Sequence, residues 1–151
     1  HLEDEQQAKI VQDAFLYFAD ERYRLLAFVV MPSHHHWLFL PNEAWATKAI
    51  KQAEAKGEKY RTPREIISHS VQSFTATMCN RVRHATGIYW QHETFDHWAR
   101  DEHEMMKIIR YIENNPVVAQ LCATPENYRW SSARLRKERG LGPTDPISKV
   151  A

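Results

Sequence analysis

The chain has 151 residues, of which 43% are hydrophobic, and its formal net charge is +1. This length and composition predict one globular domain, residues 1–151, with a core of its own. No apolar run approaches about 18 residues and no signal peptide opens the chain, which excludes a membrane-spanning protein and makes the cytoplasm the expected compartment. A charge so close to neutral does not by itself indicate a polyanionic partner.

The first third of the chain has the pattern of a helix followed by a hairpin. Residues 2–19 place apolar side chains at helical spacing and acids at the start, where the helix dipole favours them. Residues 23–30 and 36–40 are apolar and rich in β-forming side chains, with a turn-like break at 31–33, and they predict an antiparallel hairpin. Residues 48–60 are rich in Lys, Glu and Ala, which predicts a mobile excursion or an exposed helix.

A second long helix is predicted from Thr62 to about Arg83. Thr62 suits the N-cap, Pro63 the first helical position and Glu65 the third, which together form a capping box. Apolar side chains then follow at intervals of three or four residues.

The last third predicts shorter elements. Extended pieces are expected at 88–90 and 94–98, and Asp101 is the predicted N-cap of a third helix that we expect Pro116 to break. A basic tail is expected at 134–151.

The two cysteines, Cys79 and Cys122, stand in unrelated contexts and form no CxxC motif. We therefore expect both to be reduced residues of the core. The chain begins with His1 rather than methionine, so we expect a fragment that lacks its natural N-terminal segment.

Three consecutive histidines, His34 to His36, lie at the start of the second apolar run. Because side chains alternate along a strand, His34 and His36 should share one face, roughly 6.6 Å apart, while His35 points to the other. Neutral imidazole binds several divalent metals, and a strand would hold the pair rigidly. Spacing alone leaves two interpretations open, a metal-binding pair or ordinary half-buried histidines, because a pair lacks the third and fourth ligands of a strong metal motif.

Several segments carry a family resemblance through their order. They are VMPSHHH at 30–36, YWQ at 89–91, FDHWARDE at 95–102, RYIENNP at 110–116 and NYRWSS at 127–132. In this order they resemble the REP-associated tyrosine transposases, a group of HUH single-strand transposases, over most of residues 20–133. The resemblance implies an α+β fold with a ferredoxin-like antiparallel sheet and helices packed on one face, whose first strand could lie in the missing N-terminal segment.

The resemblance also implies a chemistry. The family cleaves and rejoins single-stranded DNA at hairpins, and its paired histidines hold Mg²⁺ or Mn²⁺. Here those positions are His34 and His36, and His97 is a candidate for a further ligand. A tyrosine hydroxyl would attack phosphorus to give a 5′-phosphotyrosine, so no nucleotide cofactor is required.

The expected nucleophile is missing from this sequence. The family leads us to look for a tyrosine just ahead of the Asp96-His97 pair, where Phe95 stands instead. Phenylalanine has no hydroxyl, so either the chain was disarmed by engineering or in nature, or another tyrosine acts. Tyr111 is the second candidate and Tyr89 a distant third.

The expected partner is single-stranded DNA with a hairpin, bound by a monomer or a dimer. Side chains on the predicted second helix and in the tail could contact phosphates, although a solvated face is the alternative. They are Arg64, Arg81, Arg83, Arg134, Arg136, Lys137 and Arg139. Two other functions stay open: a protein of the same fold that binds a DNA hairpin without cleaving it, and a small metal hydrolase with a non-nucleic substrate.

Overall fold

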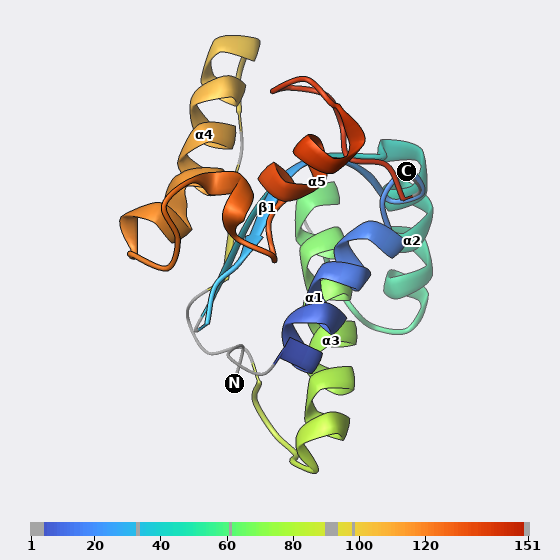
Figure 1. Ribbon diagram of the computed structural model, residues 1–151. Helices are drawn as coiled ribbons and strands as arrows, with labels where there is room; N and C mark the ends of the chain where they lie inside the picture. The colour runs from blue at the N-terminus through green and yellow to red at the C-terminus, as the bar shows by residue number, and fades with distance from the viewer. Residues whose placement is uncertain (1–4, 33, 61, 90–93, 98, 150–151) are drawn as a thin grey trace.

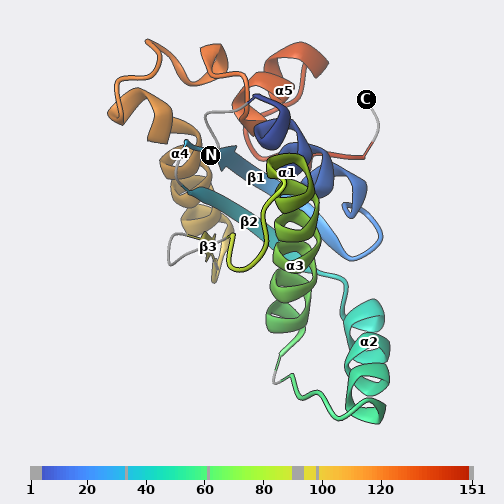
Figure 2. The same ribbon diagram turned by 90° about the horizontal axis from the view of Figure 1, so that it is seen from below.

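The computed structural model describes residues 5–32, 34–60, 62–89, 94–97 and 99–149. Within 94–97 it describes the backbone only. The elements of this part of the chain follow one another as shown in Figures 1 and 2. They are α1 (Glu5–Tyr17), β1 (Tyr23–Val30), β2 (His35–Pro41), α2 (Glu43–Ala55), α3 (Pro63–Arg83), β3 (Thr94–His97), α4 (Glu102–Val118), a short 3₁₀ helix (Pro125–Asn127) and α5 (Ser132–Arg139).

The described strands form one sheet in the order β1-β2-β3. β1 and β2 pair antiparallel from Tyr23↔Pro41 to Val30↔His35, which confirms the predicted hairpin. β3 pairs parallel to β2, so the sheet is mixed and the expectation of an antiparallel sheet is wrong at this edge. The reason is the connection: α2 and α3 carry the chain from the end of β2 back to its start, and a crossover of this kind joins parallel strands.

Helices cover both faces of the sheet, which corrects the expectation of helices on one face. α1 and α3 pack on one face, over a core that includes Phe15, Phe28 and Trp37. α4 packs on the other face, where Ile109 and Ile112 join a second cluster with side chains of β1 and β2. Figures 1 and 2 both show the sheet between these two layers. The cause lies in the strands, because almost every residue of β1 and the first five of β2 are buried, so neither face can be left to water.

Residues 43–55 form helix α2. For residues 48–60 the sequence predicted either a mobile excursion or an exposed helix, and the structure has the helix as far as Ala55. Asn42 caps its start, because the side-chain oxygen accepts a hydrogen bond from the Trp45 backbone N–H at 3.1 Å. Ala46 is its buried residue.

Helix α4 passes through Pro116 and ends at Val118, so the expected break at the proline is wrong. A proline removes its own backbone donor and crowds the carbonyl oxygen four residues earlier, which can kink a helix without ending it, and α4 continues for two residues beyond Pro116. Helix α5 replaces the expected basic tail. Its N-cap Ser131 bridges to Val29 of β1, and further on the Ile147 N–H donates to the Leu25 carbonyl oxygen at 2.8 Å. The C-terminal segment is therefore packed along the edge strand.

Cys79 is buried in the core as predicted, whereas Cys122 is only half-buried. Neither cysteine forms a disulfide. Among the described helices, none has the length and apolar character needed to cross a membrane.

Candidate metal and nucleophile site

The three histidines lie where β2 begins, and the strand separates them by face. The rings of His34 and His36 lie side by side, with centroids 5.1 Å apart and planes at 82°. His35 points to the opposite face, where its ring meets the edge of Phe15 at 5.3 Å. Only 5% of His36 is exposed. The alternation predicted from the sequence is thus the one that the structure has.

Hydrogen bonds around the hairpin fix the start of β2. The Met31 N–H donates to the His34 carbonyl oxygen at 2.8 Å, and Val30 pairs with His35 in the ladder. On the other side of β1, the Val30 N–H donates to the Trp130 carbonyl oxygen, and the Tyr128 hydroxyl donates to the Val30 carbonyl oxygen at 2.7 Å. The backbone next to the histidine pair is therefore held by hydrogen bonds on both edges of β1.

Helix α4 brings a tyrosine to this pair. The ring of Tyr111 meets the ring of His36 at 90°, with centroids 5.7 Å apart. Ile109 and Ile112, on either side of it in the sequence, are buried against the sheet and fix the rotation of the helix. Tyr111 consequently emerges at the edge of the contact, and 57% of it is exposed. A reactive hydroxyl needs both a fixed position and access for a substrate, and Tyr111 has both.

Asn115 lies one helical turn beyond Tyr111, and sequence reasoning missed it. Residues four apart share a helix face, so the Asn115 carboxamide lies on the same side of α4 as the Tyr111 ring. Its Nδ2 donates to the Tyr111 carbonyl oxygen at 2.9 Å. The available signal was the spacing of the two residues within the RYIENNP segment.

The separation of the two imidazole rings can be compared with that of two histidine ligands on one metal ion. An imidazole nitrogen binds a first-row ion at roughly 2.0–2.1 Å, so two rings that share one ion at an angle between 90° and tetrahedral have centroids about 4.5–5.2 Å apart. The observed 5.1 Å between His34 and His36 falls in this range. Within the described residues no group of three His, Cys, Asp or Glu side chains could hold a metal. A hard ion such as Mg²⁺ would need oxygen donors in addition, and a carboxamide oxygen, such as the one that Asn115 carries on the helix face of Tyr111, is a donor of the kind it prefers.

Burial lowers the pKa of His35 to about 3, and the neighbouring His36 and His34 add to the effect through charge repulsion. His35 is therefore neutral at physiological pH and belongs to the core.

β3 carries two of the predicted site positions. The backbone of Phe95 is the register partner of His36, and that of His97 is the partner of Leu38. Their side chains lie outside the described part of the chain, so both roles stay predictions.

The predicted phosphate contacts of α3 lie on the other side of the sheet from Tyr111. Arg64 donates to the Phe39 carbonyl oxygen at 2.9 Å and covers the Phe39 ring, while Arg81 and Arg83 are exposed near the C-terminal end of the helix. Because α3 and α4 cover opposite faces, one short strand of DNA at Tyr111 would not reach these arginines directly.

Arg136 is not available for the phosphate contact that we predicted, because its side chain is buried. It forms an ion pair with Glu113 at 3.1 Å and donates to the carbonyl oxygens of Leu26, Gly142 and Asp145. The pair joins α4 to α5 and β1.

The other basic side chains of α5 lie nearer the surface. Lys137 is exposed, Arg134 pairs with Glu138 at 2.9 Å, and Arg139 donates to the Ser148 carbonyl oxygen at 2.8 Å. Their predicted phosphate contacts stay predictions.

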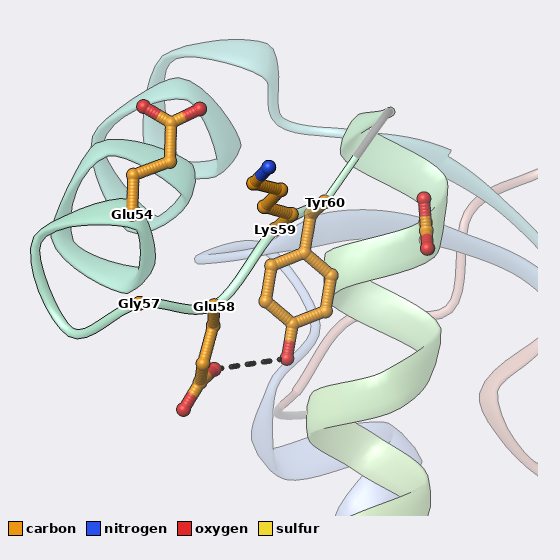
Figure 3. Close-up of a pocket in the computed structure, with 6 residues that line it drawn as sticks. Glu54, Gly57, Glu58, Lys59 and Tyr60 are labelled. Atoms are coloured by element: carbon orange, nitrogen blue, oxygen red, sulfur yellow. Dashed lines mark hydrogen bonds between the residues drawn. The ribbon is translucent and has the colours of Figure 1, made fainter.

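Two cavities of the described structure could hold a substrate. One, of about 920 Å³, lies between α4 and the segments that follow it, and Tyr111 and Asn115 line it. The other, of about 780 Å³, lies between α2 and the start of α3, where the Tyr60 hydroxyl donates to Glu58 at 3.2 Å (Figure 3). The histidine pair lines neither cavity, whereas Tyr111, whose ring contacts His36, lines the first and not the second, so we place the candidate chemistry beside the first.

A comparison with known proteins gives one relative. An uncharacterized protein of Haemophilus influenzae is 30% identical over 108 residues, which correspond to 63% of this chain and 55% of the relative. The chain thus spans about half the length of that protein. No protein family and no solved structure matches the chain.

Proposed function

We propose that this protein is a metal-dependent single-stranded DNA endonuclease and strand transferase that acts at DNA hairpins, with Tyr111 as its nucleophile. The observation that carries the proposal is the contact between Tyr111 and His36, which brings a solvent-accessible hydroxyl-bearing ring to a paired-histidine face. The ordered segments that resemble the HUH single-strand transposases support it. We further propose that the α+β fold is a variant of that family's ferredoxin-like arrangement, with β3 parallel to β2 and helices on both faces of the sheet.

The metal would be Mg²⁺ or Mn²⁺, held by His34 and His36 with the Asn115 carboxamide as an oxygen donor. When bound, such an ion polarises the scissile phosphate and orients it. His97 stays a candidate for a further ligand on β3.

The bonds and protons of the proposed tyrosine step can all be accounted for. The Tyr111 oxygen forms a bond to phosphorus, the bond from phosphorus to the 3′ oxygen breaks, and that oxygen takes up a proton to leave a 3′-hydroxyl. The phenolic proton passes to solvent, which reaches Tyr111 because 57% of the residue is exposed. The product is a 5′-phosphotyrosine that a 3′-hydroxyl can later attack to rejoin the strand.

Phe95 gives a reason to keep a second function. Its backbone stands beside His36 in the sheet, at the position where the family resemblance led us to expect the nucleophile. If a tyrosine is needed there, the chain as it stands is a DNA-hairpin-binding protein that does not cleave.

One assay separates these functions. The chain is incubated with a single-stranded hairpin oligonucleotide and Mg²⁺ or Mn²⁺, and a denaturing gel then shows cleavage and any protein-linked 5′ fragment. We expect an adduct that the Tyr111→Phe variant does not form. Tight hairpin binding without an adduct would instead favour the non-cleaving function.

A further inference from the structure

Helix α4 presents a continuous polar stripe to the cavity beside Tyr111. The groove has a volume of about 920 Å³ and is lined from α4 by Lys107, Arg110, Tyr111, Asn114 and Asn115. Their spacing of three and four residues places them along one side of the helix. The stripe thus leads directly to the proposed nucleophile.

The charge of this groove is positive where it approaches Tyr111. Lys107 and Arg110 are exposed, and neither has a hydrogen bond or ion pair to another residue that the structure describes. Glu113 also lines the groove, but Arg136 neutralises it in the buried ion pair. Glu126, on the facing wall, is the remaining acid among the described lining residues.

Two cations with no partner among the described residues, beside the proposed nucleophile, suit a polyanion. Lys107 precedes Tyr111 by one helical turn, a rise of about 6 Å, and Arg110 is its neighbour. Arginine and lysine bind phosphate oxygens with charge-assisted hydrogen bonds. A strand laid along the stripe would therefore present successive phosphates to the two cations and to the tyrosine.

We infer that Lys107 and Arg110 hold phosphates of the single DNA strand next to the phosphate that Tyr111 attacks, an inference that rests on the proposed function. These two residues, rather than the arginines of α3, then make the phosphate contacts closest to the chemistry. They position the strand and take no part in bond making.

The test measures binding of a labelled hairpin oligonucleotide with single-stranded flanks, in Mg²⁺, over a range of salt concentrations. The Lys107→Ala/Arg110→Ala double variant should bind at least about tenfold more weakly. Each lost phosphate contact should also reduce the slope of log affinity against log salt by about 0.7, so the slope should fall by about 1.4. The matched control is Lys48→Ala/Lys51→Ala, which removes the same charge from exposed positions on α2.

The outcomes distinguish this inference from the proposed function. An equal loss in both double variants shows a general charge effect and overturns the inference, as does unchanged binding by the groove variant. If the unaltered chain binds neither the hairpin nor an unstructured single strand, the inference and the function both fail. Binding that depends on Lys107 and Arg110 without a Tyr111-linked adduct overturns the chemistry and keeps the groove as a DNA-binding surface.

Discussion

The rings of His36 and Tyr111 meet edge to face, with centroids 5.7 Å apart and planes at 90°. His36 is the second residue of β2, close to the hairpin turn, and Tyr111 lies in the middle of α4. The contact exists because Leu38, two residues along the strand from His36, packs in one cluster with Ile109 and Ile112. Any change that loosens α4 from the sheet should therefore separate the proposed metal pair from the proposed nucleophile.

Tyr111→Phe should abolish the covalent adduct with a hairpin oligonucleotide and leave hairpin affinity and the free energy of unfolding nearly unchanged. The substitution removes one oxygen from a residue that is 57% exposed and keeps the ring that contacts His36. A denaturing gel measures the adduct, and urea unfolding measures the stability.

Phe95→Tyr is the matched change at the other candidate position. If Tyr111 is the nucleophile, this variant should form no more adduct than the unaltered chain. An adduct that appears only with Phe95→Tyr, and persists when Tyr111→Phe is added, would move the nucleophile to β3.

His34→Ala and His36→Ala should each abolish Mn²⁺ binding in calorimetry, whereas His35→Val should retain it. The reason is the alternation of faces, since His35 packs against Phe15 on the far side of the sheet. Asn115→Ala should weaken binding without abolishing it, because the two imidazoles would still be present. Equal losses from all three histidine changes would contradict the shared-face argument.

Arg136→Ala should lower the free energy of unfolding by about 3–5 kcal/mol, because it leaves the Glu113 carboxylate buried without its cation. The side chains of Arg136 and Glu113 are only 7% and 12% exposed. The control is Lys9→Ala, which breaks the exposed pair with Asp13 and should cost no more than about 0.5 kcal/mol. Comparable losses for the two variants in urea unfolding would show that the buried pair contributes no more than a surface pair.

The stability of the fold should decrease as the pH falls from about 6.5 towards 3, the window set by the lowered pKa of His35. In the folded chain burial holds the pKa of His35 at about 3, whereas the unfolded chain takes up the proton near the ordinary value of 6.5. The unfolded state therefore binds more protons throughout this window, and the stabilisation present above it is lost as the pH falls.

Urea unfolding in EDTA at pH 7.5 and 4.5 measures this effect. The fall should be on the order of 2–3 kcal/mol larger for the unaltered chain than for His35→Val. His103→Ala, at an exposed position of α4, should keep the full fall. A fall of the same size in His35→Val would assign the pH dependence to other groups.

The sequence alone determined much of the secondary structure, because helix caps and strand alternation depend on residues close together in the chain. The predicted N-caps Thr62 and Asp101 both accept hydrogen bonds from the N–H of the third helical residue, at 3.1 Å from Glu65 and 2.8 Å from Glu104. The hairpin and the opposite directions of His35 and His36 followed from alternation along a strand. These features involve residues only a few positions apart, so the sequence pattern contains the interacting partners.

The tertiary structure decided what the pattern left open. The family resemblance ranked the position of Phe95 ahead of Tyr111, and only the packing of α4 on the sheet places the Tyr111 ring against His36. It likewise turned Arg136 from an expected phosphate contact into the buried partner of Glu113. Both outcomes depend on how a helix is rotated against a distant strand, and that rotation is set by the joint burial of apolar side chains from far-apart segments, which no local spacing encodes.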